Sequence, residues 1–164
     1  MYSKYETKMT SDSQIYETPD ELFLPLHKEF NFELDVCANE NNHKVEQYYD
    51  EKDDCFTKDW KLTSWMNPEF VKVGKFIKKA YEESVKHGST IVCLTMVKSN
   101  TNWWRDIAMK AKEIRFINQK VQFKGTPQGL RFPCCLIIFS PHDGETKFSV
   151  FQQDFSITKC LECE

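Results

Sequence analysis

Residues 90–97 constrain the fold of this chain more than any other segment. They form an almost continuous apolar run of strand length, without the alternation of apolar and polar side chains that a half-exposed strand shows. Such a run is typical of a strand covered on both faces, as in sheets that carry helices on either side. The segment therefore predicts a buried strand of an α/β domain.

Helical patterns occur on both sides of this strand in the sequence. A helix is predicted over residues 19–29, because Thr18 suits the N-cap, Pro19 suits the first helical position and Glu21 closes a capping box. The apolar residues of this segment then recur at helical spacing. Two further helices are predicted, one from residue 73 to a stop at Gly88 and one over residues 101–111 with Thr101 as its cap.

Short strand patterns fill most of the remaining chain. Apolar residues alternate at positions 32, 34 and 36, which predicts a strand within residues 32–38. The other predicted strands cover residues 45–49, 64–67, 114–117 and 134–139, with an edge at 148–151. Alternating strands and helices predict an α/β domain with a largely parallel sheet and helices on both faces. The strand-rich later part favours an antiparallel pair at one edge.

The length of 164 residues suits a single domain. Residues 1–14 are polar without periodicity and are expected to form a flexible arm. The predicted domain covers residues 15–155, and residues 156–164 are expected to form a C-terminal tail. No particular oligomeric state is predicted.

Charge and cysteine content narrow the functional classes. The formal net charge of −3 and the pI near 5.9 argue against sequence-independent coating of nucleic acid but allow a local basic groove. No apolar run is long enough for a membrane span. Seven cysteines at irregular spacing predict reduced thiols in a cytoplasmic protein. Cys160 and Cys163 lack a second ligand pair, so no metal site is predicted.

Polar residues stand at the ends of successive predicted strands. Asp35, Asp54 and Asn67 follow one another with short connections, and ligands of open α/β sheets bind outside the carboxyl ends of the strands. The chain has neither a P-loop nor a G-x-G-x-x-G motif. The sequence therefore predicts a ligand with hydroxyl and amino groups rather than a di- or triphosphate.

The segment Asn67-Pro68-Glu69-Phe70 is the candidate for the chemistry. The Asn67 side-chain oxygen and the Pro68 carbonyl are two acceptors that could bind the hydrogens of an exocyclic base amine. Accepting those hydrogens would make the amine more nucleophilic and stabilise the positive charge that grows on it. Phe70 could stack on the base, which must leave the duplex to reach such a site. The alternative interpretation is an ordinary strand-to-loop turn with an Asn-Pro breaker.

The wider pattern resembles the phage-type DNA N6-adenine methyltransferases, a compact group that uses S-adenosylmethionine. The resemblance extends from about residue 15 to residue 139 and depends on the order and spacing of short pieces. These pieces are Tyr16-Glu17-Thr18-Pro19, residues 30–38 with Asn41, Tyr48-Tyr49, Asp54 with Trp60, Trp65-Met66-Asn67-Pro68, Lys79-Ala80, Trp103-Trp104, residues 114–117 with Phe123, and Phe132-Pro133.

The resemblance implies a Rossmann-like class I methyltransferase fold with an antiparallel terminal strand. It implies methyl transfer from S-adenosylmethionine to the N6 amine of an adenine flipped out of DNA. It places Thr18 and Pro19 near the methionine end of the cofactor. Asp35, Cys37 and Ala38 would form the first cofactor motif, Asp54 and Phe56 would contact the cofactor adenine, and Asn67, Pro68 and Phe70 would form the catalytic motif.

Glu69 departs from the family pattern, which usually has a second proline in an Asn-Pro-Pro-Tyr or Phe-ended motif. Glutamate frees a backbone torsion that proline would fix, and it brings a carboxylate close to the target amine. That carboxylate could point away, pair with the cofactor sulfonium or act as a base. The alternative function is therefore an impaired or inactive methyltransferase-fold protein that acts as a cofactor-binding, DNA-binding or regulatory module.

Candidate DNA contacts lie in the second half of the chain. Trp103 is a candidate for stacking or pocket closure, and a long loop carries Lys124, Gln128 and Arg131. A group of basic residues near the third helix is more typical of a solvated helix face than of a phosphate-binding site. This group consists of Lys98, Arg105, Lys110 and Lys112.

Overall fold

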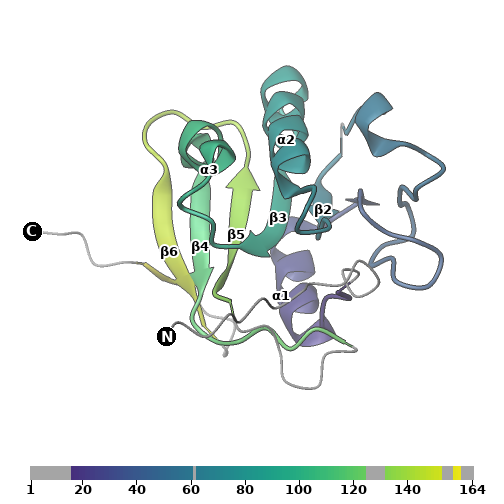
Figure 1. The fold of residues 1–164 in the computed structure, drawn as a ribbon, viewed down its shortest axis with the longest axis horizontal. Helices are drawn as coiled ribbons and strands as arrows, with labels where there is room; N and C mark the ends of the chain where they lie inside the picture. The colour runs from purple at the N-terminus through teal and green to yellow at the C-terminus, as the bar shows by residue number, and fades with distance from the viewer. Residues whose placement is uncertain (1–15, 61, 125–131, 153–156, 160–164) are drawn as a thin grey trace, which may run out of the picture.

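The computed structural model describes residues 16–60, 62–124, 132–152 and the backbone of 157–159 (Figure 1). A seven-stranded sheet runs in the order β1-β2-β3-β5-β4-β6-β7. The strands are β1 Leu34–Asp35, β2 Ser64–Met66, β3 Ile91–Met96, β4 Glu113–Ile117, β5 Cys134–Phe139, β6 Lys147–Phe151 and β7 Ile157–Lys159. The helices are α1 Asp20–Phe30, α2 Val73–His87 and α3 Asn102–Asp106, with 3-10 turns at Cys55–Thr57 and Ala108–Lys110. The predicted arm at residues 1–14 lies outside the described residues.

The sheet is mixed, and the predicted direction of its strands is confirmed only in part. β1, β2 and β3 are parallel neighbours, as are β4 and β6. β5 is antiparallel to both of its neighbours and lies inside the sheet, between β3 and β4, while β7 is the antiparallel strand at the end. The apolar run of residues 134–139 predicts a buried strand correctly, but such a run is the same for either direction. An interior antiparallel strand was therefore not predicted.

Helices cover both faces of the sheet, as predicted (Figure 1). On one face α2 and the 3-10 turn at Ala108–Lys110 bury the first core, whose sheet residues include Met66, Ile91 and Ile137. On the other face α1 buries the second core against residues such as Trp65, Val92 and Leu136. All six residues of β3 are buried, which confirms the prediction of a strand covered on both faces.

α1 and α2 confirm the helices predicted from periodicity. α2 ends where Gly88 adopts a left-handed conformation with φ 69°, which glycine tolerates and which lets its N–H bind the Ser84 carbonyl. The predicted capping box at α1 is wrong, because the cap is Pro19 without a side-chain hydrogen bond. The hydroxyl of Thr18 instead faces the site described below.

Two other predicted elements differ in the structure: one is absent and the other is interrupted. Residues 45–49 form no strand and contribute only a single bridge between Tyr48 and Asp35. The predicted helix over 101–111 breaks at Ile107, whose φ of −127° and ψ of −56° lie outside the helical range. The break places Ala108 and Ala111 in the core, where both are completely buried. Thr101 does not cap through its side chain; its hydroxyl donates to the Lys98 carbonyl at 2.8 Å.

A buried ionic group joins α1 to the sheet. The Arg115 guanidinium donates to both carboxylate oxygens of Glu29 at 2.7 Å and to Glu113 at 3.1 Å. Ser149 of β6 donates to the same Glu113 carboxylate at 2.5 Å. Burial acts to raise the pKa of Glu113, but the hydrogen bonds from Arg115 and Ser149 outweigh it, so this pKa is lowered. Glu113 is therefore an ionised carboxylate inside the protein.

A second ionic group fixes the segment that leads into β2. The Glu83 carboxylate accepts the Trp60 backbone N–H at 2.6 Å and an ammonium hydrogen of Lys79 at 2.5 Å. His87 and Asp59 lie beside it, and Lys86 pairs with Asp59 at 3.2 Å. The lysines neutralise these carboxylates, and the group connects α2 to the segment around Trp60. Within the described ranges, no helix is long and apolar enough to cross a membrane.

Candidate active site

A cavity of about 770 Å³ opens at the carboxyl ends of β1 and β2, where the sheet topology predicts a ligand site. It brings together most of the predicted site residues. Those that line it are Thr18, Asp35, Cys37, Ala38, Asp54, Phe56, Asn67 and Glu69. Pro19, Pro68 and Phe70 are not part of the lining.

Asn67 is held at the cavity by the segment that precedes α1. Its side-chain Nδ2 donates to the Tyr16 carbonyl at 2.6 Å and to the Thr18 hydroxyl at 3.1 Å. A carbonyl oxygen can only accept, so the amide must face it with its nitrogen. Among the described residues none donates to the other end of this amide, Oδ1, which is left as an acceptor for a ligand.

Phe70 lies behind the cavity wall. Its ring is 8% exposed and packs against Tyr16, with ring centroids 5.5 Å apart, and against Phe123 at 6.5 Å. Of the packed pair Tyr16 and Phe70, it is Tyr16 that lines the cavity. Phe70 therefore supports this wall from behind, and sequence reasoning missed Tyr16 because its position depends on packing between distant segments.

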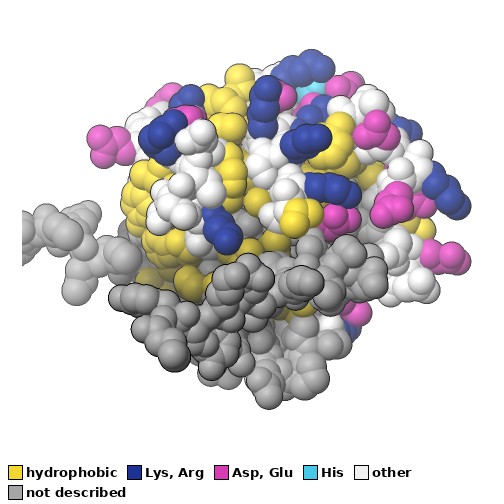
Figure 2. Space-filling model, viewed as in Figure 1, with side chains coloured by type: hydrophobic (Ala, Val, Ile, Leu, Met, Phe, Trp, Pro, Cys, Tyr) yellow, Lys and Arg dark blue, Asp and Glu magenta, His cyan; other side chains and the backbone are white. Residues whose placement is uncertain are grey.

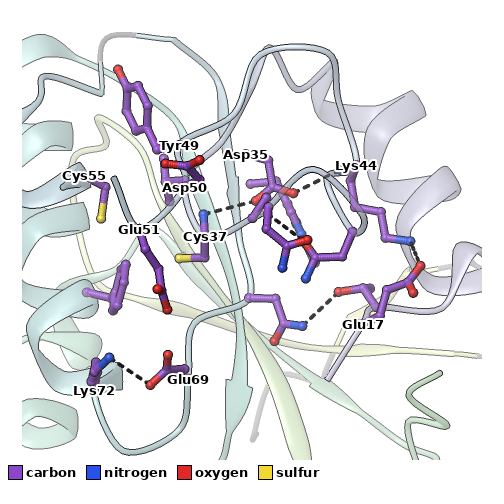
Figure 3. A pocket seen from close by; sticks show the side chains of 18 of the residues that line it. Glu17, Asp35, Cys37, Lys44, Tyr49, Asp50, Glu51, Cys55, Glu69 and Lys72 are labelled. Atoms are coloured by element: carbon purple, nitrogen blue, oxygen red, sulfur yellow. Dashed lines mark hydrogen bonds and ion pairs between the residues drawn. The ribbon is translucent and has the colours of Figure 1, made fainter. Parts of the chain in front are cut away.

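Asp35 organises the loop that follows β1. One carboxylate oxygen accepts the Cys37 N–H at 3.3 Å and the other accepts the Lys44 N–H at 3.1 Å (Figure 3). Burial raises the pKa of this carboxyl to about 6, although the two backbone hydrogen bonds and the Lys44 charge act to lower it. The pKa of the neighbouring Cys37 thiol is raised by burial and by Asp35, and that of Cys55 is raised to about 11 by burial. Both cavity thiols are therefore uncharged near neutral pH.

The raised pKa of Asp35 predicts a pH dependence of stability. The folded protein binds this proton with a pKa of about 6 against a model value of 3.8, so it holds more protons than the unfolded chain between these values. The contribution of Asp35 to stability therefore falls as the pH rises from about 4 to about 6, by on the order of 3 kcal/mol. Urea unfolding of the wild type and of Asp35→Asn across this range should show that difference.

A variant of Asp106 should show the opposite pH dependence of stability. The pKa of Asp106 is lowered by its hydrogen bond with Arg105, so its contribution to stability should rise with pH over its titration range. Asp106→Asn therefore serves as the control for the Asp35→Asn comparison. Equal pH profiles for wild type and Asp35→Asn would contradict the assignment of the raised pKa.

Four charged side chains join the segment before α1 to two other parts of the chain. Lys44 Nζ lies 3.2 Å from Glu17 and 2.9 Å from Asp20, and its side chain is only 8% exposed. Lys124 Nζ lies 2.7 Å from the same Glu17 carboxylate and 3.4 Å from Asp20. These ion pairs connect the loop after β1, the start of α1 and the segment after β4. Lys124, which was predicted to contact DNA, thus has its charge paired with two carboxylates at the protein surface.

The side of the cavity near residues 50–56 is acidic and partly apolar. Asp50, Glu51 and Asp54 supply carboxylates, and the Glu51 carboxylate points into the cavity in Figure 3. Asp54 adopts a left-handed conformation with φ 46° and accepts the Phe56 N–H at 3.3 Å, which begins the 3-10 turn. The Phe56 ring packs on Phe76 of α2, with centroids 4.7 Å apart, and both rings line the cavity.

Glu69 lies at the opposite border of the cavity and is paired. Its carboxylate is 3.1 Å from Nζ of Lys72, three residues further on, and about a third of its side chain is exposed (Figure 3). The pair neutralises the charge that distinguishes this segment from the family pattern. Sequence spacing alone gave no reason to expect Lys72 rather than a ligand as the partner of Glu69.

Trp103, another predicted DNA contact, does not line the cavity. Trp103 is half-buried and lies against α2, where a Cβ on Gly74 would approach its Cδ1 to 3.0 Å. Gln128 and Arg131 lie outside the described residues. The cavity instead contains residues that were not predicted, among them Tyr16, Lys44, Glu51 and Lys72. They are brought together by the fold and carry no local motif.

Comparison with known proteins gives a consistent result. A family model described as DNA N-6-adenine-methyltransferase (Dam) matches residues 6–151. A DNA N-6-adenine-methyltransferase of Haemophilus phage HP1 (strain HP1c1) is 33% identical over 150 residues, covering 86% of both chains. One of Escherichia phage T1 is 28% identical over 119 residues, covering 70% of this chain but 50% of that relative. No solved structure matches the chain.

Proposed function

This chain belongs to the Dam family of DNA N-6-adenine-methyltransferases, and we propose that it uses S-adenosylmethionine to methylate the N6 amine of adenine in DNA. The observation that carries the proposal is the fixed orientation of Asn67. Its nitrogen is held by Tyr16 and Thr18, so its oxygen is preorganised as an acceptor. The cavity that it borders is suited to the cofactor.

Asn67 acts on the amine of a target adenine that has left the duplex. Oδ1 accepts one N6 hydrogen, and the family resemblance makes the carbonyl of Pro68, which follows Asn67 but does not line the cavity, the candidate acceptor for the other. Both interactions favour the nucleophilic geometry of the nitrogen and stabilise the positive charge that develops on it. Because Nδ2 is already bound, the amide does not have to reorient when the base arrives, and this preorganisation is the source of the rate enhancement.

The residues of the cavity fit the proposed cofactor. S-adenosylmethionine, when bound, supplies a methyl group whose bond to N6 forms as its bond to sulfur breaks, with one N6 proton released to water. The carboxylates of Asp50, Glu51 and Asp54 are suited to accept from ribose hydroxyls and to attract a sulfonium cation. Phe56 and Phe76 provide an apolar wall for an adenine ring.

The proposal is tested by methyl transfer from labelled cofactor to unmethylated DNA, followed by identification of the modified base. The expected product is N6-methyladenine. Cofactor binding is measured separately by calorimetry without DNA. Binding of the cofactor without any transfer would support the non-catalytic module instead, and absence of both would contradict the whole proposal.

Glu69→Pro is expected to raise kcat severalfold. Proline fixes a backbone torsion next to the catalytic amide and removes the carboxylate, and within the described residues the Glu69 N–H makes no hydrogen bond that proline would remove. The lost ion pair with Lys72 is partly exposed and contributes less than about 1 kcal/mol. Steady-state kinetics of Glu69→Pro and of Glu69→Gln, which removes only the charge, separate the two effects. A slower proline variant would show that glutamate itself is required.

A further inference from the structure

The sheet divides the surroundings of Asn67 into two chemically different sides. β2, which ends one residue before Asn67, lies between β1 and β3. The loop after β1 contributes Asp50, Glu51 and Asp54 to the cavity lining, and Figure 2 shows several acidic side chains at the right and several basic ones nearer the centre, over α2. The polyanionic backbone of DNA therefore meets repulsion on the β1 side.

The β3 side carries an exposed aromatic residue next to a lysine. Phe132 is 49% exposed, and Lys98 Nζ lies 5.7 Å from the centre of its ring. The backbone fixes both positions, since the Val97 N–H donates to the Pro133 carbonyl at 2.9 Å and the Thr101 hydroxyl donates to the Lys98 carbonyl. Among the described residues Lys98 has no ion-pair partner, so a stacking surface and a positive charge lie side by side at this position.

The loop that carries Lys98 also borders the catalytic segment. Trp103, five residues further on, packs against Gly74 in the first turn of α2. That turn follows Phe70 after two residues, one of which, Val71, is 68% exposed. Lys98 and Phe132 thus lie at the same edge of the sheet as Asn67, on the side away from the acidic loops.

We propose that Lys98 and Phe132 form the contact surface for the DNA strand that carries the target adenine. Lys98 binds a backbone phosphate beside the target, and Phe132 stacks on the neighbouring base, one face of which is uncovered when the adenine leaves the helix. The proposal rests on the proposed function only in taking DNA as the substrate. It explains why a chain of net charge −3 can bind DNA through a local surface.

The test measures the binding of a fluorescein-labelled duplex of mixed sequence by anisotropy at several salt concentrations. Lys98→Glu should weaken binding at least tenfold at low salt, and Lys98→Ala should reduce the slope of log K against log salt by about 0.9. Phe132→Leu should weaken binding about tenfold without changing that slope. Exposed Phe132 is outside the core, so the folded state should tolerate leucine.

Matched controls lie at the opposite end of the sheet. Lys112 precedes β4 and Phe148 lies in the first half of β6, where it is 38% exposed. Lys112→Glu and Phe148→Leu should leave DNA binding unchanged. If the Lys98 and Phe132 variants bind like these controls, the surface is wrongly assigned.

A kinetic measurement separates this proposal from the methyltransferase function. If the wild type methylates DNA while Lys98→Glu and Phe132→Leu leave its KM for DNA unchanged, the surface is wrong and the function stands. If the wild type transfers no methyl group but the two variants lose DNA binding as expected, the surface stands and the proposed reaction is wrong.

Discussion

Asn67→Ala is expected to lower kcat for adenine methylation by about 10²–10³-fold, because it removes the oxygen that is preorganised for the target amine. The KM for the cofactor should change little. The Tyr16 carbonyl and Thr18 hydroxyl lose their partner, at a cost of about 1–2 kcal/mol in the free energy of unfolding, so the protein should remain folded at room temperature. Steady-state kinetics and circular dichroism check the two expectations together.

Two further variants separate the oxygen of Asn67 from its orientation. Asn67→Asp keeps an acceptor but places a second oxygen against the Tyr16 carbonyl, so it should also lose most activity. Thr18→Val removes one of the two partners of Nδ2, and we expect a loss of about tenfold in kcat. If Thr18 instead contacts the methionine end of the cofactor, as the family resemblance implies, the same variant raises the KM for the cofactor. Asn118→Ala, at an exposed site after β4, should have no effect.

Arg115→Leu is expected to destabilise the protein by about 3 kcal/mol or more, since it leaves the Glu113 carboxylate buried without its cation. Glu29 is partly exposed and can find water, so most of the cost belongs to Glu113. Urea unfolding measures the change. Activity of the folded fraction should be retained, because this ionic group joins α1 to β4 and does not line the cavity.

The double variant Arg115→Leu with Glu113→Gln gives the control for this prediction. Removing both charges should restore part of the lost stability, because the remaining amide can still accept from Ser149. A double variant as unstable as the sum of the single ones would contradict the assignment of the cost to an unpaired carboxylate.

Local sequence patterns predicted the helices and strands, but not which strands pair with one another in the sheet. The apolar face of α2 and its glycine stop, and the buried run that forms β3, depend on residues close in sequence. The interior position of β5 depends on which strands pair, and a buried strand has the same apolar pattern in either direction. For the same reason the hydroxyl of Thr18 could be assigned to a helix cap, although its partner in the structure is an amide far along the chain.

The sequence predicted that several of these residues lie together, but not the contacts that they make. Asp35, Asp54 and Asn67 share one cavity because strand ends of parallel neighbours meet at one edge of the sheet. The pairing of Lys124 with Glu17, and of Glu69 with Lys72, follows from side-chain positions that only the folded chain defines. Two charges that were predicted to be available for DNA or the cofactor, those of Lys124 and Glu69, are therefore paired within the protein.

The attachments of the segment before α1 have a consequence for the order of events during synthesis. Tyr16 and Glu17 are synthesised before their partners. The Tyr16 carbonyl binds Asn67, which is 51 residues later, and Glu17 binds Lys124, which is 107 residues later. Contacts of such sequence separation form slowly, since the intervening chain must first be ordered. The nascent chain should therefore acquire its helices well before the Asn67 amide is aligned, and methylation activity should appear only after these long-range contacts have formed.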